Sequence, residues 1–356
     1  MSAVQRAPKS ARMQGTEVSA KGSLARAEFL RLVSRRLVRL LVLIGLFGVL
    51  AGAFLVFIRT GNASPADIAS AKLQAEQQYQ FCASNVQSAP APVSPSTNPD
   101  GSPSPGPNPQ TLTAAQIAQL CSTSYENYLR STPFHAATGV GGGALAVLGG
   151  FAVLFLIIGA TAGGAEWSAK TMPALLTWEP RRMRVLTTKV LVLDAVTLVL
   201  AAGAAALWFV LALLIAHFHG DWSGRPSNFW SLLAAQEGKG LLLAAVTATT
   251  GFALASLMRS TGAVLGVAFA YLVLVENAVR IFAPKLSPWI IGNNVAALLL
   301  PHGYDAQISR DGRPVFGVPP QLWYHISGFQ GGALLTAVAV TLFAAALFLF
   351  HRRDLT

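Results

Sequence analysis

The sequence has few charged residues, and this scarcity is its first informative feature. Only 12% of the 356 residues are Asp, Glu, Lys or Arg, whereas a soluble domain carries about a quarter. Apolar residues make up 53% of the chain and gather into long continuous runs. Alternating ten-residue strands, the pattern of a transmembrane β-barrel, are missing. The composition therefore argues against a soluble globular protein and predicts an all-α membrane protein.

Sequence motifs for catalysis and nucleotide binding are also missing. The chain has no phosphate-cradling loop of the G-x-x-x-x-G-K-[ST] type, and Gly238-Lys239-Gly240 is only a fragment with the wrong spacing. His217, His219 and Asp221 lie close together in the sequence. Two histidines fall short of a closed metal site, so a polar membrane boundary is the simpler interpretation. Paired carboxylates and Ser/His/Asp patterns are absent as well. We therefore expect no enzyme, and no metal or cofactor bound by this chain.

Six apolar runs are each long enough to cross a hydrocarbon core about 30 Å thick as a helix. Lipid cannot satisfy exposed backbone groups, so we expect a bundle of six transmembrane helices. The predicted spans cover residues 40–58, 139–162, 190–215, 240–257, 262–282 and 331–350.

Basic residues are distributed unevenly around these spans. Nine of the 26 Lys and Arg residues precede the first span, and eight more fall on the same side when six helices alternate across the membrane. The positive-inside rule therefore places both termini, including the tail 351–356, in the cytoplasm of a multi-pass protein of the plasma or inner membrane. The net charge of +11 is then a topology signal, and no nucleic-acid partner is expected. Residues 1–22 are expected to be a disordered cytoplasmic tail without a signal peptide.

Residues 23–39, directly before the first span, carry the pattern of an amphipathic helix. Arg31, Arg35 and Arg39 step by four residues along one face. Apolar side chains recur at helical spacing along another face: Leu24, Ala27, Leu30, Val33, Leu37 and Leu40. The pattern predicts an interfacial helix on the inner leaflet, where basic side chains meet anionic lipid. A plain cytoplasmic extension of the first span is the alternative.

The segment 59–138, between the first two spans, is expected to be an extracytoplasmic helical insert. Ser64 is a capping residue and Pro65 suits the first helical position, so a helix starts there and can run to about residue 86. A Pro/Ser-rich loop over 88–112 cannot build a core. A second capping box begins at Thr113 and starts a helix that reaches about residue 128.

The only two cysteines, Cys82 and Cys121, lie near the loop-proximal part of each insert helix. Both helices start from membrane-anchored ends, and an extracytoplasmic compartment is oxidising. We therefore favour an intramolecular disulfide that closes the proline-rich loop and contributes about 2–4 kcal/mol. Two free thiols, or a bridge between chains, are the alternatives.

Ionisable residues are rare inside the predicted spans. Asp194 lies five residues after Lys189, so it can reach the inner interface and is interpreted as structural. Glu276 lies deeper in the fifth span and is followed by Asn277 and, one turn on, by Arg280. An ionisable group at that depth should face the bundle or a wet cavity. Two interpretations stay open: a packing or capping device near the outer surface, or part of the translocation path or subunit interface.

The connection between the second and third spans, residues 163–189, is the most specific stretch. Its residue pattern predicts an amphipathic helix that is broken by Pro180 and followed by a basic cluster. The alternative is a plain loop whose basic residues only follow the positive-inside rule. The segment resembles the loop of the type-2 ABC exporter permeases, although Lys170 stands where many members have Gly. The matching residues are Glu166, Thr171, Leu175, Leu176, Pro180, Arg181, Arg182 and Lys189.

Shorter pieces agree with the same family. Residues 255–263 look like its tight inner turn between the fourth and fifth spans, and 350–355 look like its C-terminal ending. Residues 287–300 look like its short outer helix, here inside the extracytoplasmic loop 283–330. The resemblance covers most of residues 23–356, but the long insert is not typical of the family.

The resemblance implies the transmembrane subunit of an ATP-driven exporter. Such a subunit pairs with a second permease copy and docks two cytoplasmic ABC ATPase subunits, which bind the ATP and magnesium. The N-terminal helix would be a second contact with them. The first, second and fifth spans would line a lateral path through the lipid for an amphipathic drug, lipid, glycan or peptide. The residues that the resemblance assigns to coupling are Glu166, Trp167, Lys170, Thr171, Leu175, Leu176, Arg181 and Arg182.

Two other classes of protein are weighed against this one. An ion-coupled secondary transporter would use Glu276 as its ion site, but the chain has a single deep acid and no inverted repeat. A membrane-anchored sensor or assembly protein would act through the 59–138 ectodomain.

Overall fold

The computed structural model describes residues 20–88, 114–129, 132–169, 181–221, 226–309 and 322–352. Within these residues, six helical segments are long and apolar enough to cross a membrane, so the chain is a multi-pass membrane protein. Each segment contains one of the six predicted spans. Five of the segments belong to single helices: α2 (Arg36–Arg59), α5 (Ala136–Ser168), α7 (Arg182–His219), α8 (Phe229–Met258) and α12 (Gly328–Arg352).

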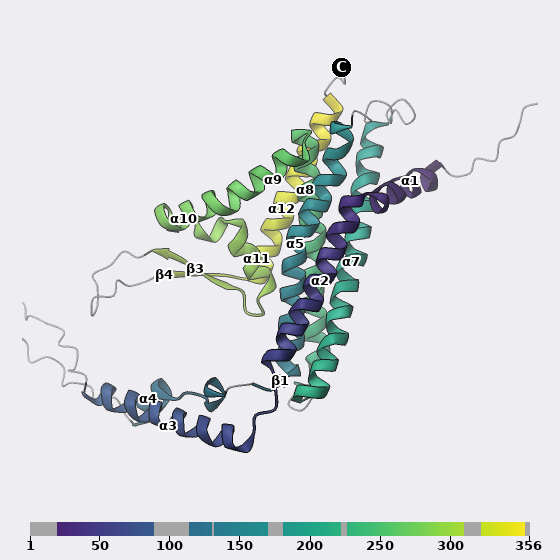
Figure 1. Cartoon of the computed structure of the whole chain (residues 1–356). Coiled ribbons are helices and arrows are strands. Elements are labelled where there is room, and N and C mark those ends of the chain that lie inside the picture. Colours follow the sequence, from purple (N-terminus) through teal and green to yellow (C-terminus); the bar gives the residue numbers. More distant parts are fainter. Residues whose placement is uncertain are drawn as a thin grey trace, which may run out of the picture. The chain divides into compact units, whose positions relative to one another are not determined.

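The fifth segment along the chain is not one regular helix. α9 (Thr261–Ala270) continues through the π-helical η2 (Tyr271–Val275) into α10 (Glu276–Phe282). Only 11% of its most apolar part is buried, which is the lowest share among the six segments. Figure 1 shows α9 and α10 diverging from α8 and α12. Most of this segment is therefore left to contact lipid or another molecule.

The described chain divides into two compact units. The larger unit comprises Met1–Val49, Gly141–Trp208 and Asn228–Thr356, and the smaller unit comprises Leu50–Val140 and Phe209–Ser227. Each unit has buried side chains of its own.

The core of the larger unit lies where its long helices pack side by side (Figure 1). A Cβ atom added to Gly159 of α5 would overlap the carbonyl oxygen of Ala248 in α8, and one added to Gly163 would lie 2.6 Å from the Phe252 oxygen. This G-x-x-x-G spacing lets two membrane helices bring their backbones together. The largest fully buried side chains of the core cluster that includes Ala248 are Leu148, Phe155, Ile158, Leu186, Leu193 and Phe252.

The predicted N-terminal amphipathic helix begins earlier and ends sooner than expected. α1 covers Ala20–Ser34, and a break at Arg35 separates it from α2. The Ser34 hydroxyl donates to the Arg31 carbonyl at 3.1 Å, and the Arg39 guanidinium donates to the Ser34 carbonyl at 3.0 Å. These side chains satisfy carbonyls that a continuous helix would pair with backbone N–H groups. The last predicted turn therefore belongs to α2.

The predicted apolar stripe of α1 faces away from the rest of the larger unit. Leu30 is 56% exposed and Val33 is 41% exposed, whereas Glu28 and Leu32 on the other side are buried. The helix thus packs through a face that includes a carboxylate and leaves an apolar face uncovered.

The smaller unit contains α3 (Pro65–Ser88), the first helix predicted in the insert. Ser64 and Asp67 form a capping box at its start, because the Ser64 hydroxyl accepts from the Asp67 N–H at 3.1 Å. The Ser64 N–H in turn donates to the Asp67 carboxylate at 3.3 Å. The capping residues read from the sequence therefore start this helix at Pro65.

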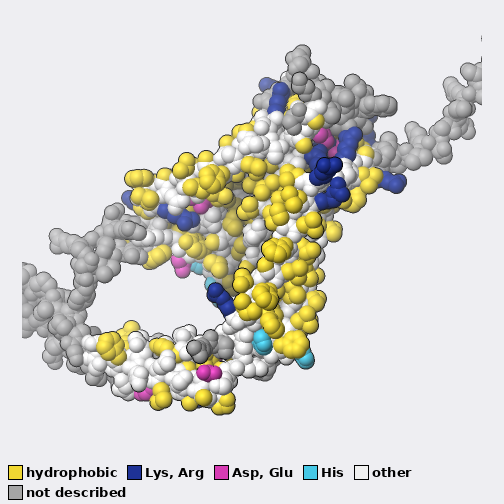
Figure 2. Space-filling model, viewed as in Figure 1, with side chains coloured by type: hydrophobic (Ala, Val, Ile, Leu, Met, Phe, Trp, Pro, Cys, Tyr) yellow, Lys and Arg dark blue, Asp and Glu magenta, His cyan; other side chains and the backbone are white. Residues whose placement is uncertain are grey.

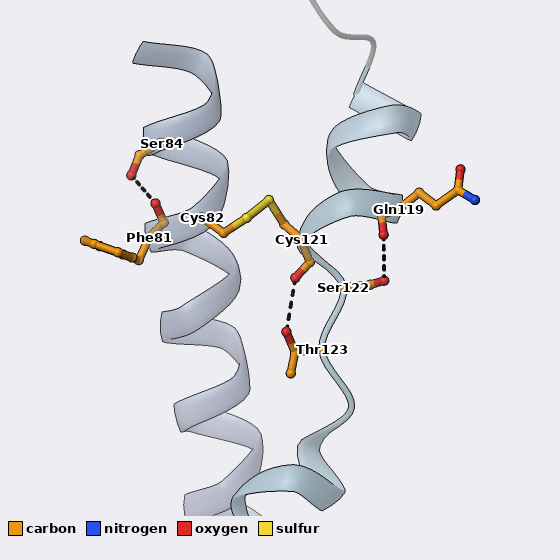
Figure 3. Close-up of a disulfide and its surroundings, with 7 residues drawn as sticks. All are labelled: Phe81, Cys82, Ser84, Gln119, Cys121, Ser122 and Thr123. Carbon is orange, nitrogen blue, oxygen red and sulfur yellow. Dashed lines mark hydrogen bonds between the residues drawn. A yellow bond between two sulfur atoms is a disulfide. The ribbon is translucent and has the colours of Figure 1, made fainter. Parts of the chain in front are cut away.

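A disulfide joins α3 to α4 (Ala114–Cys121), as Figure 3 shows. Cys82 and Cys121 are bonded with their Cα atoms 5.6 Å apart, which is the pairing favoured from the sequence. The second insert helix ends at Cys121 and not near residue 128, where the separate 3₁₀ turn η1 (Tyr125–Tyr128) lies. Most of the proline-rich loop and the predicted cap Thr113 lie outside the described residues.

The smaller unit also contains a short strand pair. β1 (Phe134–His135) pairs in parallel with β2 (Gly220–Asp221), and a single bridge joins Thr60 to Thr132. The Thr60–Thr132 bridge joins the two ends of the insert, and the strand pair joins its second end to the end of α7.

The segment predicted as a loop with one short helix, 283–330, is more structured than expected. A 3₁₀ helix η3 (Pro284–Trp289) leads into α11 (Ile291–Leu299), and an antiparallel pair follows, β3 (Tyr304–Ser309) with β4 (Leu322–Ile326). The strands are a departure from the all-helical prediction. Ala297 of α11, Ala306 of β3 and Ile326 of β4 bury one another, so the pair is held by tertiary packing.

Candidate functional site

Five charged side chains, four from α1, α5 and α7 and one from the break directly after α1, form what we name the α1–α5–α7 ion cluster: Glu28, Arg31, Arg35, Glu166 and Lys189. Lys189 Nζ lies 2.7 Å from Glu28 Oε2 and 2.6 Å from Glu166 Oε1, so one ammonium group bridges two carboxylates. The lysine side chain is only 5% exposed. Because buried charges are tolerated only when paired, this contact requires α1, α5 and α7 to stay together.

Of the two arginines in the cluster, Arg31 belongs to α1 and Arg35 lies at the break between α1 and α2. Arg35 Nη2 lies 3.7 Å from Glu166 Oε1, and its Nη1 donates to the backbone carbonyl of Thr161 in α5. Arg31 Nη1 donates to Glu28 Oε1 at 3.2 Å from a half-exposed position. Figure 2 shows further basic side chains gathered where α1 meets α2. The cluster therefore extends from a buried lysine to a basic surface.

Trp167, the residue after Glu166, ties the same end of α5 to two other helices. Its ring packs edge-on against Phe350 of α12, with the ring centroids 6.1 Å apart. The Arg259 guanidinium carbon lies 4.6 Å from the Trp167 ring centroid, a cation–π arrangement. Arg259 ends α8 in the left-handed conformation, with φ at 55°. Glu166 and Trp167 together connect the end of α5 to α1, α7, α8 and α12.

The start of α9 also rests on this end of α5. A Cβ atom added to Gly164 would lie 2.7 Å from the Thr261 nitrogen, so the two backbones are in contact. The Thr261 hydroxyl donates to the Ala160 carbonyl at 3.4 Å. The last two turns of α5 are therefore a meeting point for the helices of the larger unit.

The structure places the predicted coupling residues unevenly. Glu166 is buried and Trp167 is half-buried, both at the end of α5. Arg181 is exposed directly before α7, and Arg182 is the first residue of that helix. The remaining four lie outside the described residues: Lys170, Thr171, Leu175 and Leu176. The described part thus shows how both ends of the predicted coupling segment are anchored.

A second polar group, which we name the α10–α11 cluster, surrounds Glu276. The side chain of Glu276 is 7% exposed. Glu276 Oε1 accepts from the Gly292 N–H at 2.7 Å, at the start of α11, and Oε2 lies 3.4 Å from Arg280 Nη2. Arg280 also donates to the Asn293 side-chain oxygen at 3.0 Å. A carboxylate at a helix N-terminus is favourably placed, so Glu276 holds α11 against α10.

Asn277, the other polar residue singled out in this span, is not part of that cluster. It donates to the Val273 carbonyl of its own helix at 2.8 Å and is exposed. The adjoining Tyr271 hydroxyl accepts from the Ile291 N–H at 3.2 Å, a second bond from η2 to the start of α11. The geometry around Glu276 fits the capping interpretation, and the translocation interpretation stays a prediction.

Two other polar features of the spans have local partners. The Thr249 hydroxyl of α8 lies 3.0 and 3.1 Å from the two carboxylate oxygens of Asp194 in α7. His219 Nδ1 lies 3.1 Å from the Phe57 carbonyl, and its ring stacks on Phe57 with centroids 4.3 Å apart. Among the described residues, no three His, Cys, Asp or Glu side chains are grouped as metal ligands would be.

Comparison with known proteins assigns no family to the chain, which matches no protein-family model and no curated protein. The chemistry of the site therefore rests on the residues described above.

Two features of the site are missing from the sequence-based prediction. Glu28 lies in the predicted amphipathic helix 23–39, which contains five arginines and no other acid. A single acid among these arginines was the available signal for a buried ion pair. Gly159 and Gly163 lie in and directly after the second predicted span, which is predicted from the length of its apolar run alone. Their G-x-x-x-G spacing was a usable signal for close helix packing.

Proposed function

We propose that the chain is the transmembrane permease subunit of an ATP-driven exporter of the type-2 ABC class. It would act with a separate ATP-binding subunit in two copies and with a second permease copy. The substrate would be amphipathic, such as a drug, lipid, glycan or peptide. No phosphate-cradling loop occurs in the chain, so the energy source in this proposal is a partner.

The observation that carries the proposal is the anchoring of both ends of the predicted coupling segment. Glu166 and Trp167 lie near the start of that segment and contact α7, α8, α12 and the break between α1 and α2. Lys189 is the last residue of the segment and is bonded to Glu166 itself. A force applied to the residues between these anchors would move the anchored helices together as a rigid body. Buried ion pairs and packed rings are not easily deformed, so they would transmit the movement.

The proposed orientation places both termini and the α1–α5–α7 ion cluster on the cytoplasmic side. The exposed apolar stripe of α1 and the basic side chains near its end suit a helix lying on the inner leaflet. The Cys82–Cys121 disulfide suits an insert in an oxidising, extracytoplasmic compartment. In this orientation α1 can contact the ATP-binding subunit beside the coupling segment.

The environment of Glu276 weighs against an ion-coupled secondary transporter. Its carboxylate already accepts from the Gly292 N–H and faces Arg280. A group that must bind and release an ion during transport would need these partners to move away each time. The fixed contacts therefore support an ATP-driven mechanism over an ion-coupled one.

The first test is purification of the tagged full chain from its native host in mild detergent. We expect a P-loop ATPase subunit to come along at equal stoichiometry. Repeated recovery of the intact chain without such a subunit would contradict the proposal and favour the ion-coupled or ectodomain functions.

A charge-reversal variant tests the coupling segment within the purified complex. Replacing Arg181→Glu and Arg182→Glu together should lower the substrate-stimulated ATPase rate while membrane insertion stays unchanged. The Arg352→Glu variant changes charge at the end of α12 and serves as the control. Unchanged transport and ATPase activity in the double variant would refute the assignment of this segment.

A further inference from the structure

A cavity of about 920 Å³ lies beside α10 in the larger unit. Its walls come from the end of α10, from η3, from the start of α11 and from β3 and β4. Ligand-binding pockets for drug-sized molecules have volumes of about 300–1,000 Å³. The cavity is therefore large enough for a ligand of substantial size, and the ion cluster and the coupling segment are not part of it.

The charged groups that line this cavity are basic. Arg280 and Lys285 both line it, and no described lining residue carries a carboxylate. Arg280 uses one nitrogen toward Glu276 and Asn293, which leaves other guanidinium N–H groups for a ligand. Lys285 is exposed, and no ion pair joins it to any residue that the structure describes. Figure 2 shows basic side chains next to hydrophobic ones at the α10 end of the molecule.

The rest of the lining is largely apolar and aromatic. Phe282, Tyr304 and Trp323 contribute rings, and Ile281 and Ile308 contribute aliphatic surface. Trp323 is 56% exposed, a large area for an aromatic ring to leave uncovered. Aromatic side chains with one polar end favour boundaries between an apolar group and water.

One side-chain amide in the wall lacks a partner. The Nε2 atom of Gln307 is buried and makes no hydrogen bond to any described residue. Gln307 lines the cavity and stands opposite Trp323 in the strand pair. A buried donor without an acceptor is unfavourable, so an acceptor group on a ligand would satisfy it.

We propose that this cavity binds an amphiphile with one anionic head group, such as an acidic phospholipid. Arg280 and Lys285 would hold the anionic group by charge-assisted hydrogen bonds, and the Gln307 amide would donate to another oxygen of the head group. The rings of Phe282 and Trp323 would cover the first part of the apolar tail. A cationic ligand would meet two like charges, and a small inorganic anion would leave the apolar walls uncovered.

The inference goes beyond the proposed function, because binding can be measured on this chain without any ATPase subunit. The full chain in non-ionic detergent is mixed with short-chain phosphatidylglycerol and phosphatidylcholine that carry the same acyl chains. Native mass spectrometry then counts the molecules retained. We expect preferential retention of phosphatidylglycerol, and inorganic phosphate alone should not displace it at equal concentration.

Two variants locate the site. Lys285→Gln should weaken phosphatidylglycerol binding about tenfold, the effect of losing one charge-assisted contact, without changing phosphatidylcholine retention. Lys72→Gln removes the same charge from an exposed position of the smaller unit and should bind as the wild type does. Trp323→Ala should weaken the retention of both lipids.

Three results would overturn the proposal. The first is equal retention of the two lipids by the wild-type chain. The second is an equal loss in Lys285→Gln and Lys72→Gln, which would indicate a general surface charge effect. The third is displacement of the lipid by inorganic phosphate alone, which would make the cavity a simple anion site. Thermal unfolding of each variant confirms that it is folded.

Discussion

At the scale of single residues, Lys189 decides how three helices meet. Its ammonium group bridges Glu28 of α1 and Glu166 of α5, while its own backbone belongs to α7. All three charged groups are buried, and the cost of removing them from water offsets most of the attraction between them. The net contribution of the pairing to the free energy of unfolding is therefore small. Removing one partner is costly, however, because it leaves the other charges buried and unpaired.

We therefore predict that Lys189→Met lowers the free energy of unfolding by about 3–5 kcal/mol. The methionine keeps the length of the side chain but leaves two buried carboxylates without their bridge. Chemical unfolding in detergent measures the change, and Lys239→Met, a lysine of α8 outside the cluster, is the matched control.

A triple variant sharpens this test. Combining Lys189→Met with Glu28→Gln and Glu166→Gln should recover part of the lost stability, because no buried charge then lacks its partner. Equal losses in Lys189→Met and Lys239→Met, with no recovery in the combined variant, would contradict the structural role of the cluster.

At the scale of elements, α5 is the helix against which the others are placed. Its last turns contact α7 and the break after α1 through Glu166, α8 and α12 through Trp167, and α9 through Gly164. In the same part of the helix, Gly159 and Gly163 lie directly against the α8 backbone. A displacement of the end of α5 is therefore shared with most helices of the larger unit, as the proposed coupling to an ATP-binding subunit would require.

The contact between α5 and α8 gives a prediction at this scale. Gly159→Ala adds a methyl group where the Ala248 carbonyl oxygen lies, so the helices must separate, at a cost of about 1–3 kcal/mol. Gly150→Ala in the same helix meets no atom within 4 Å and should be neutral or slightly stabilising. Unfolding in detergent compares the two variants, and an equal effect of both would show that the close contact does not limit stability.

At the scale of the whole molecule, the division into two units separates two kinds of stabilisation. The larger unit depends on helix packing, glycine contacts and buried ion pairs. In the smaller unit, the short helix α4 is held to α3 by a disulfide that closes a segment of 39 residues. A helix of eight residues has little stability of its own, so the covalent link matters there.

We predict that Cys82→Ser combined with Cys121→Ser destabilises the pairing of α4 with α3 by about 4 kcal/mol, the loop-closure value for a segment of this length. Hydrogen exchange of the α4 amides should become much faster. Amides of α5 in the larger unit should exchange as before, which makes them the internal control. Unchanged protection of α4 would show that its packing on α3 is sufficient without the disulfide.

The orientation of the whole chain is testable by labelling in intact cells. A membrane-impermeant maleimide should label Ser70→Cys in α3 from outside, and should label Arg26→Cys in α1 only after the cells are opened. The two native cysteines are bonded and do not react. Labelling of both positions from outside would contradict the placement of basic segments in the cytoplasm.

Much of this architecture could be predicted because its signals are local. A run of about 20 apolar residues defines a membrane helix without any knowledge of its neighbours, and a Ser–Asp capping box starts α3 where the sequence places it. The β3–β4 pair could not be predicted in this way. Its strands are separated by 12 residues and gain stability only by packing Ala306 and Ile326 against α11.

The candidate site shows the same limit. The sequence singled out Glu166, Glu276 and Arg280 by type and position, but it contained no sign of which groups they contact. Glu28 lies 161 residues from Lys189 and Gly292 lies 16 residues from Glu276, and neither pairing follows from helical spacing. Long-range pairs depend on how helices are placed beside one another.

By itself, the sequence determined the six apolar helices, the excess of basic residues on one side and the start of the insert. Each of these follows from residues that are neighbours along the chain. Only the tertiary structure decided that Lys189 bridges α1 and α5, that Glu276 caps α11, and that α10, α11 and the strand pair enclose a basic cavity. Buried charges and backbone N–H groups must find partners wherever the fold brings them, so these contacts are set by packing and not by spacing along the sequence.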